Sequence, residues 1–202
     1  MRVLELFSGT GSVGKVCKKL GWEVVSLDLK GADINIDIMN WDYKALYKEG
    51  DFDIIWASPP CNTFSKLAFC NIGRKLKRLN GEVVTKEILM NEMETIGIPI
   101  LRKTEEIISY LKPTYYFIEN PQTGRMKEFM NHHKHYDASY CMYGFNYRKT
   151  TRFWTNKEGL ILNVCNKKCG KIRDNKHINN VSDFPLNQRY SIPESLIFCL
   201  LT

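Results

Sequence analysis

The sequence predicts an α/β fold, a mostly parallel sheet with helices on both faces. Two observations support this prediction. Apolar runs typical of buried strands alternate with segments whose apolar residues recur at helical spacing, as in sheets built from strand–helix–strand units. The chain has 202 residues, of which 44% are hydrophobic, with no internal repeat and no low-complexity linker. A chain of this length can bury one sizeable core, so we expect one main domain.

The expected elements follow in order along the chain. The run RVLELF at 2–7 predicts the first strand. Residues 11–21 predict a helix, because apolar side chains recur along one face and Gly21 stands where a helix would stop. A later helix is expected to end near Leu111. The other expected strands are 23–28, 34–38, 52–57, 114–119, 136–143 and 151–155.

Two basic segments interrupt this alternation. Residues 62–81 contain five Lys or Arg and no Asp or Glu, and residues 156–188 are polar, basic and weakly periodic. We therefore expect a ligand-binding domain at 1–155 that carries the basic loop 62–81. A small basic segment at 156–188 follows it, and a C-terminal segment at 189–202 returns to the domain.

Charge and cysteine content narrow the class of protein. Lys and Arg outnumber Asp and Glu by 29 to 22, and the resulting net charge of +7 suits a polyanionic partner. Seven cysteines, an odd number at irregular spacings, are typical of a reducing compartment in which thiols stay free. The chain starts with a strand-like run, and no apolar stretch approaches the roughly 20 residues of a membrane span. We expect a soluble intracellular protein without a targeting segment.

The stretch ELFSGTGSVG at 5–14 leads from a strand through glycines into a helix. Open α/β sheets bind nucleotide-like ligands at such a turn, because Gly9 and Gly11 let the backbone bend sharply and approach a ligand closely. The spacing differs from the dinucleotide-binding motif and from the P-loop, which argues against a phosphate cradle. A simple strand–helix turn is the alternative that this stretch alone leaves open.

Two acidic residues stand at the ends of later strands. Asp28 ends the second expected strand and Asp37 the third. An adenosine-containing ligand would use both carboxylates, Asp28 for the ribose hydroxyls and Asp37 for the adenine amino group. Each residue also fits a solvated strand end.

The stretch WASPPCNTFS at 56–65 places Cys61 after two prolines at the end of a buried strand. Proline cannot continue the hydrogen-bonded ladder, so the thiol is expected at the carboxyl edge of the sheet, where ligands bind. Beside the Lys- and Arg-rich loop its pKa would fall and its thiolate would act as a nucleophile. Glu119, at the end of the fifth strand, would lie beside it and manage protons. The alternative for Cys61 is a small filler at a tight corner.

Five stretches in order, FSGTGS, SPPCNTFS, IENP, YGFNYRKTTRFWTN and QRYSIPESL, resemble the motifs of the cytosine-5 DNA methyltransferases, in particular the small single-domain viral and phage members. The resemblance runs from Met1 to about Trp154 and resumes near Gln188. It implies a Rossmann-like S-adenosylmethionine-dependent methyltransferase fold with a much reduced target-recognition region. Residues 1–155 would form the catalytic domain, 62–81 its catalytic loop and 156–188 a minimal DNA-reading segment.

The resemblance also implies a role for each motif residue. Cys61 would add to C6 of a flipped cytosine, and Glu119 would hydrogen-bond the N3 side of the ring. Arg148 or Arg152 would steady the base, and their spacing in YRKTTR departs from that of the family, which leaves open which of them acts. S-adenosylmethionine would be held by Phe7, Ser8, Gly9, Gly11, Ser12, Asp28, Asp37, Ile38 and Pro59.

The two basic segments are the expected contacts to duplex DNA. The large target-recognition domain of the family is missing, and residues 156–188 leave room for few base contacts. We therefore expect a target of roughly two to four base pairs, with CpG as the leading candidate. Phosphate contacts would come from Lys66, Arg74, Lys75, Lys77 and Arg78, and target contacts from Lys167, Lys168, Lys171 and Arg173.

Two rival functions stay open. An RNA cytosine-5 methyltransferase, acting on transfer RNA, would use the same scaffold. A catalytically idle DNA-binding module would keep the cofactor pocket, although the intact pair Cys61 and Glu119 argues against it. Adenine methylation is disfavoured, because that chemistry usually pairs the prolines with an aromatic side chain rather than a cysteine.

The segment CNKKCGKIRDNKH raises the question of a metal site. Cys165, Cys169 and His177 are possible zinc ligands, but a fourth ligand would have to come from Cys199 or His135. We therefore expect a basic loop that lies against phosphates, and no metal. We also expect a monomer that does not bind membranes, located in the nucleus or cytoplasm of a host cell if the protein is viral.

Overall fold

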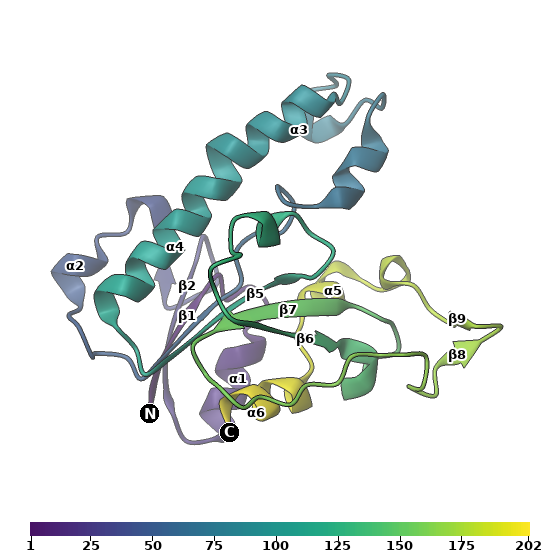
Figure 1. The fold of residues 1–202 in the computed structure, drawn as a ribbon. Helices are drawn as coiled ribbons and strands as arrows, with labels where there is room; N and C mark the ends of the chain where they lie inside the picture. Colours follow the sequence, from purple (N-terminus) through teal and green to yellow (C-terminus); the bar gives the residue numbers. More distant parts are fainter.

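A seven-stranded sheet forms the centre of the molecule (Figure 1). The computed structural model describes the backbone of residues 1–202 and every side chain except that of Arg78. The strand order is β3-β2-β1-β4-β5-β7-β6; β7 runs antiparallel to both of its neighbours, and the other adjacent pairs are parallel. The bounds are β1 (Arg2–Leu6), β2 (Glu23–Asp28), β3 (Ile34–Asn35), β4 (Ile54–Ala57), β5 (Tyr115–Pro121), β6 (His135–Ser139) and β7 (Thr150–Thr155).

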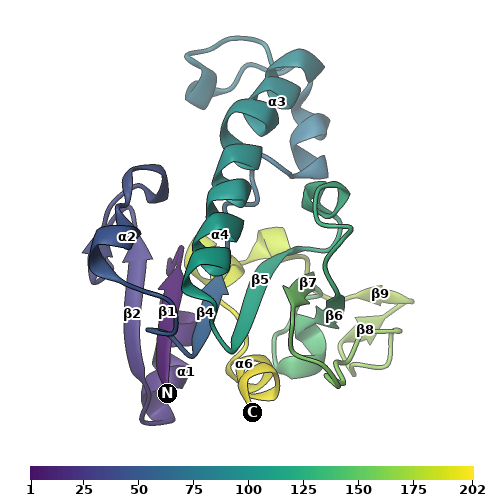
Figure 2. The same cartoon turned by 60° about the vertical axis from the view of Figure 1, so that its left-hand side comes forward.

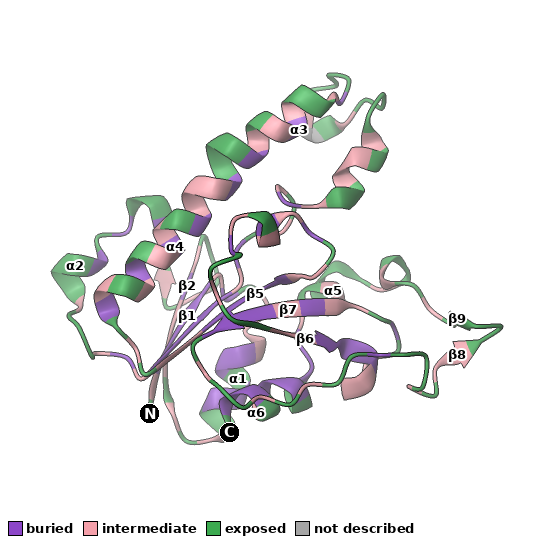
Figure 3. Ribbon diagram, in the orientation of Figure 1, coloured by how far each residue is buried: buried purple, intermediate pink, exposed green. Residues whose placement is uncertain are grey.

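Helices cover both faces of this sheet (Figure 2). On one face lie α1 (Ser12–Lys19) and α6 (Glu194–Leu201), and on the other α2 (Tyr43–Leu46) and α4 (Ile98–Leu111). Alternating side chains of β4 divide between the faces: Ile54 and Trp56 pack with α1 and α6, whereas Ile55 packs with α4. Figure 3 shows that the central strands β1, β4, β5 and β7 are mostly buried, whereas β2 and β3 are only partly buried. The predicted α/β fold with a mostly parallel, two-sided sheet is therefore confirmed.

Two of the expected strands end at least three residues before the position that the sequence predicts. The third is only Ile34–Asn35, because Asp37 caps a 3-10 helix, η1 (Ile38–Asn40), with its side chain accepting a hydrogen bond from the Met39 N–H. The sixth ends at Ser139, where the chain turns into another 3-10 helix, η6 (Tyr140–Tyr143). Side-chain capping competes with strand pairing at the first of these sites, which an apolar run alone does not reveal.

The basic loop 62–81 projects from the sheet at the far end of the α3–α4 arm (Figures 1 and 2). It contains η2 (Lys66–Asn71) and η3 (Lys77–Leu79) and leads into α3 (Lys86–Glu92), the π-helix η4 (Met93–Gly97) and α4. The base of the loop packs against Gly97, where an added Cβ would lie only 2.5 Å from Thr63 Oγ1 and 3.1 Å from the Phe64 ring. Glycine at this position thus allows the loop to lie against the helix.

The segment 156–188 lies beyond the β6–β7 edge of the sheet (Figure 1). It folds into a two-stranded hairpin, β8 (Ile172–Arg173) and β9 (Lys176–His177), followed by η7 (Val181–Asp183) and α5 (Leu186–Tyr190). A further 3-10 helix, η5 (Met126–Glu128), follows β5. None of the helices that the structure describes is both long and apolar enough to cross a lipid bilayer.

Candidate active site

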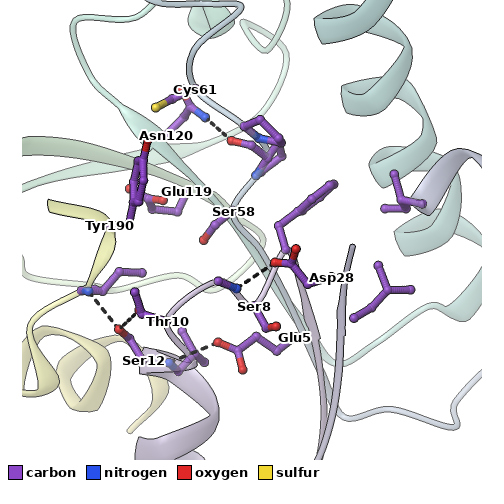
Figure 4. Close-up of a pocket in the computed structure, with 18 of the residues that line it drawn as sticks. Glu5, Ser8, Thr10, Ser12, Asp28, Ser58, Cys61, Glu119, Asn120 and Tyr190 are labelled. Atoms are coloured by element: carbon purple, nitrogen blue, oxygen red, sulfur yellow. Dashed lines mark hydrogen bonds between the residues drawn. The ribbon is translucent and has the colours of Figure 1, made fainter. Parts of the chain in front are cut away.

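A cavity of about 390 Å³ lies at the carboxyl ends of β1, β2, β4 and β5 (Figure 4). Parallel strands end together at this edge, which is where open α/β sheets bind ligands. The volume falls within the range of small-molecule sites. The predicted site residues that line it are Phe7, Ser8, Gly9, Ser12, Asp28, Asp37, Ile38, Pro59, Cys61 and Glu119.

The glycine-containing turn after β1 forms one wall of the cavity. Phe7 and Gly9 both have positive φ, 60° and 50°. Glycine adopts this backbone conformation without strain, whereas for Phe7 it is energetically unfavourable. Two contacts tie the turn to β2: Ser8 N–H donates to Leu27 O over 3.1 Å, and Gly9 N–H donates to Asp28 Oδ2 over 2.8 Å. Gly11 does not line the cavity, so we no longer expect it to contact the ligand. It is instead the N-cap of α1, with φ 65°.

The two predicted carboxylates lie on the neighbouring wall. Asp28 accepts from the backbone N–H of Gly9 and from that of Leu29 at 2.7 Å, which fixes its orientation toward the cavity. Asp37 accepts from the Met39 N–H at 2.9 Å and lies beside Ile38. Both carboxylates keep acceptor capacity that a ligand rich in hydroxyl and amino donors can use.

Glu5 is a functional candidate that the sequence interpretation missed. It lies within β1, is buried, and accepts hydrogen bonds from the N–H groups of Val13 at 3.3 Å and Gly14 at 3.0 Å. It thus fastens the start of α1 to the sheet and lines the floor of the cavity (Figure 4). Burial raises the pKa of Glu5 to about 7. An acidic residue inside the apolar run RVLELF was the signal available.

Cys61 stands at the mouth of the cavity on a turn that Asn120 holds in place. The Asn120 Nδ2 donates to Pro59 O over 2.9 Å, and Phe64 N–H donates to Cys61 O over 3.2 Å. Asn120 is 1% exposed, and its Oδ1 has no hydrogen-bond partner among the described residues. The turn after the paired prolines is therefore anchored from both sides, and Asn120 keeps one buried acceptor available.

Glu119 shares this cavity with Cys61 and lies beside one hydroxyl group and one ammonium group. The Tyr140 hydroxyl donates to Glu119 Oε1 over 3.3 Å, and Lys149 Nζ lies 3.8 Å from the same oxygen. Lys149 also lies over the Tyr140 ring, 4.9 Å from its centroid. The sequence interpretation missed Lys149, because it stands between the two arginines that the family motif marks. The carboxylate, lysine and tyrosine form a buried polar group beside the thiol.

The expected fall in the pKa of Cys61 is wrong. Burial, and then the negative charge of Glu119, raise the pKa of the Cys61 thiol, and Lys149 only partly offsets them. The lysines and arginines of the basic loop do not contribute, because most of the loop projects away from the turn (Figure 1). Near neutral pH this raised pKa favours the protonated thiol of Cys61 over the thiolate.

The two candidate arginines have different positions. Arg152 pairs with Asp137 on β6 through two hydrogen bonds of 2.7 and 2.8 Å. It lines neither the cavity described above nor a second cavity that also reaches Cys61, so we leave it out of the residues proposed to bind the base. Arg148 lines this second cavity, which has a volume of about 560 Å³. This cavity lies between the start of the basic loop, at Lys66, and α5.

The basic residues predicted to bind DNA fall into two groups. Lys66, Arg74, Lys75 and Lys77 are exposed and make no ion pair with any side chain that the structure describes, while the side chain of Arg78 lies outside that description. In the second group, Lys168 and Arg173 are exposed, whereas Lys167 Nζ donates to Asn175 Oδ1 at 2.8 Å. Lys171 is only partly exposed and its Nζ donates to Phe145 O at 2.5 Å, so we leave it out of the proposed target contacts.

Replacing Lys149 tests this electrostatic arrangement. We expect Lys149→Met to raise the pKa of Cys61 further, because this substitution removes the positive charge that lowers it. Alkylation of Cys61 by iodoacetamide at a fixed pH near 8 should slow by roughly three- to tenfold, since one pKa unit changes the thiolate fraction tenfold. Mass spectrometry of the Cys61 peptide measures the rate. Lys75→Met is the control, and an equal rate in both variants would contradict the assignment.

Comparison with known proteins supplies independent information. No protein-family model matches the chain. A curated protein of Frog virus 3 (isolate Goorha), described as a probable DNA (cytosine-5)-methyltransferase, is 47% identical over 167 residues, which are 82% of this chain and 75% of that protein.

Solved structures give a likeness in fold. The Entamoeba histolytica methyltransferase EhMeth matches with a TM-score of 0.51 and 15% identity over 80% of this chain and 56% of that one. A putative DNA modification methyltransferase of an E. coli prophage matches with a TM-score of 0.49 and 17% identity over 77% of this chain and 46% of that one. This chain therefore spans about half the length of these solved structures. The likeness to EhMeth confirms the Rossmann-like methyltransferase fold.

Proposed function

The chain belongs to the DNA cytosine-5 methyltransferase family, and from that premise we propose that it transfers a methyl group from S-adenosylmethionine to C5 of cytosine in duplex DNA. One observation carries the proposal: Cys61 and Glu119, which the family resemblance makes nucleophile and acid–base partner, line the same cavity as Asp28. An idle binding module would have no need to keep a thiol and a carboxylate together at a ligand-sized cavity.

The cavity fits S-adenosylmethionine in its size and in the chemistry of its walls. Phe7, Leu29 and Ile38 offer apolar surface for an adenine ring, and Asp28 offers the carboxylate that a ribose requires. The turn from Phe7 to Thr10 and the buried carboxyl of Glu5 would surround the methionine part. When bound, S-adenosylmethionine supplies an electrophilic methyl group.

In the proposed mechanism Cys61 and Glu119 act as a pair that shares one proton. The raised pKa of Cys61 favours the protonated thiol before the cytosine enters. As the cytosine enters, the proton passes to Glu119, which then donates a hydrogen bond to N3 while the Cys61 sulfur bonds to C6. The electron pair of the C5–C6 double bond would then form the new bond from C5 to the methyl group that S-adenosylmethionine supplies, with S-adenosylhomocysteine as the leaving group. Water would take the C5 proton, the double bond would re-form as the S–C6 bond breaks, and Cys61 would regain its proton from Glu119.

Tyr140 and Lys149 would hold Glu119 during this sequence. Tyr140 is fully buried and donates to Glu119 Oε1, so it fixes the carboxyl toward the base. The ammonium group of Lys149 balances the single negative charge that the pair carries whether the proton is on sulfur or on oxygen. The charged site therefore needs little rearrangement as the reaction proceeds.

The second cavity is the proposed entrance for the flipped cytosine. It opens beside Cys61, and its walls carry Lys66 and Arg148, two cations suited to the phosphates on either side of a flipped nucleotide. Within segment 156–188, Lys168 and Arg173 remain as exposed candidates for target contacts. One good bidentate contact favours the correct base over a wrong one by about 1–3 kcal/mol. Two such residues therefore support a short target, for which CpG is the leading candidate.

Analysis of methylated nucleosides tests the function. Duplex DNA incubated with protein and S-adenosylmethionine should yield 5-methyl-2′-deoxycytidine, detected by mass spectrometry. Transfer RNA treated in the same way should gain no 5-methylcytidine. Bisulfite sequencing of a random-sequence plasmid from the same reaction should then locate the methyl groups at a site of roughly two to four base pairs. Methyl transfer to RNA alone, or N6-methylation of adenine, would overturn the proposal.

Neutralising the basic loop tests its proposed role in binding phosphates. The double variant Lys75→Gln/Lys77→Gln should bind every DNA sequence more weakly and reduce the slope of log K against log salt by roughly 0.9 for each phosphate interaction that the substitutions remove. Fluorescence anisotropy over a salt series measures this slope. Lys44→Gln/Lys112→Gln is a matched control of equal charge change, because both lysines are exposed and paired with glutamates. Equal slopes for the two double variants would mean that the loop is merely solvated.

A further inference from the structure

Four metal-binding side chains from three parts of the chain converge beside the sheet edge. The sulfurs of Cys141, Cys165 and Cys169 and a ring nitrogen of His177 all lie within 4.8 Å of one another. His177 Nε2 lies 3.5 Å from Cys165 Sγ and 3.4 Å from Cys169 Sγ. None of the four residues lines either cavity at Cys61. The proposed methyl-transfer chemistry therefore makes no use of them.

We propose that these residues bind one Zn²⁺ ion in a closed, tetrahedral site that has a structural role. Three thiolates and one imidazole are a common ligand set for structural zinc, and with four protein ligands no position is left open for a substrate. The fourth ligand is Cys141 on η6, not Cys199 or His135 as the sequence pattern suggested. This proposal replaces our expectation of a basic loop without a metal.

The backbone around the cluster is shaped to bring the ligands together. Lys167 has a positive φ of 72°, and its N–H donates to Cys165 Sγ over 3.3 Å, a hydrogen bond that suits a metal-bound thiolate. Asp174 and Asn175, with φ of 49° and 63°, form the two-residue turn of the β8–β9 hairpin. That hairpin returns the chain so that His177 faces the two cysteines.

The segment that carries three of these ligands has little apolar core of its own. Several of its apolar side chains are exposed, including Ile161 at 89% and Ile178 at 59%, and Leu160 and Leu162 are only partly buried, whereas Cys165 is 5% exposed. Small units that bury little apolar surface commonly depend on a metal for stability. Positive charge is also available beside what would be a site of net charge −1, because Lys167 and Lys168 stand between Cys165 and Cys169 in the sequence and Lys171 Nζ lies 3.5 Å from Cys141 O.

The proposed metal would join segment 156–188 to the part of the domain that carries the active-site cations. Cys141 belongs to η6, which starts directly after β6, and Lys171 bonds to Phe145 O just beyond η6. Asn179 Nδ2 donates to Asn146 O over 3.3 Å, and Asn179 pairs with Tyr147, the residue before Arg148. Loss of the metal should therefore loosen the DNA-facing loops more than the cofactor cavity.

A second cluster provides a useful contrast. Glu105, His132 and His133 also lie close together. Both ring nitrogens of His133 already have partners, Tyr116 Oη at 2.8 Å and Glu105 Oε1 at 3.0 Å, and the group has no cysteine. A metal there would have to displace existing hydrogen bonds, so we assign none. His132→Asn is accordingly a control for substitutions of His177.

Metal analysis of the purified protein tests the site. After expression with zinc and removal of loosely bound metal by gel filtration, wild type should carry about one zinc per chain by inductively coupled plasma mass spectrometry. Cys169→Ser and His177→Asn should fall to about a tenth of that content or less. Cys199→Ser and His132→Asn, which change an exposed thiol and an imidazole outside the cluster, should keep it in full.

Cobalt substitution separates ligand loss from misfolding. Protein reconstituted with Co²⁺ should show the visible absorption of a tetrahedral complex and strong sulfur-to-metal charge transfer. His177→Cys, which exchanges one zinc ligand for another, should retain the metal and intensify the charge-transfer band, as a loss of fold would not. Wild type without zinc, or full zinc content in Cys169→Ser, would overturn the proposal. Neither outcome depends on methyl transfer, so failure here is distinct from failure of the proposed function.

Discussion

Cys61→Ser should lower methyl transfer to duplex DNA by a factor on the order of a thousand or more, because the substitution removes the sulfur that is proposed to bond to C6. Fold and cofactor affinity should change little, since the residue is at a turn and the substitution removes little buried volume. Transfer of a tritiated methyl group to DNA measures the activity, and calorimetric titration with S-adenosylmethionine measures the cofactor affinity.

Cys70→Ser is the matched control for this experiment. Cys70 is exposed on the same basic loop and lines neither cavity, so its replacement should leave transfer unchanged. Wild type, but not Cys61→Ser, should also form a stable covalent complex with DNA that contains 5-fluorocytosine, because fluorine cannot leave C5 as a proton does. A fully active Cys61→Ser protein would exclude the covalent mechanism.

Glu119→Gln should have two opposite effects on one site. Methyl transfer should fall by roughly 10²- to 10³-fold, because the amide can neither take the thiol proton nor donate it toward N3. The thiol itself should become more reactive. The negative charge of Glu119 raises the pKa of Cys61, so its removal lowers that pKa and increases the thiolate fraction at any pH below it.

The two effects are measured on the same protein. The rate of Cys61 alkylation by iodoacetamide at pH 7 should rise several-fold in Glu119→Gln, although burial still keeps the pKa above that of a free thiol. Glu158→Gln, an exposed residue paired with Lys134, controls for the loss of one negative charge. Slower alkylation in Glu119→Gln would show that the carboxylate does not face the thiol as proposed.

The sequence predicted the sheet and the placement of its ligand edge, because both depend on local patterns. Buried strands are short apolar runs, and polar or reactive residues near their carboxyl ends, such as Asp28, Cys61 and Glu119, can be recognised one at a time. Parallel strands bring their carboxyl ends to one edge, so these residues lie around one cavity without any further information. Their roles in catalysis stay predictions that the variants above test.

Other features depended on contacts between distant parts of the chain and were decided only by the tertiary structure. The pKa of Cys61 is set by burial and by Glu119 from another strand, not by the basic residues next to it in sequence. Lys149 and Arg152 are close neighbours in sequence, yet one faces Glu119 and the other pairs with Asp137, because strand pairing and twist determine which side chains share a face.

The proposed zinc site is the clearest case of this difference. Cys165, Cys169 and His177 can be recognised in the sequence as a local pattern. Cys141 is distant from them in the sequence, and only the packing of η6 near the β8–β9 hairpin places it beside them. The sequence by itself thus determined which local elements form and which residues stand at their ends, since those follow from periodicity and backbone preference. The tertiary structure decided charge environments and ligand sets, because electrostatic and coordination geometry depend on distance in space and not on separation along the chain.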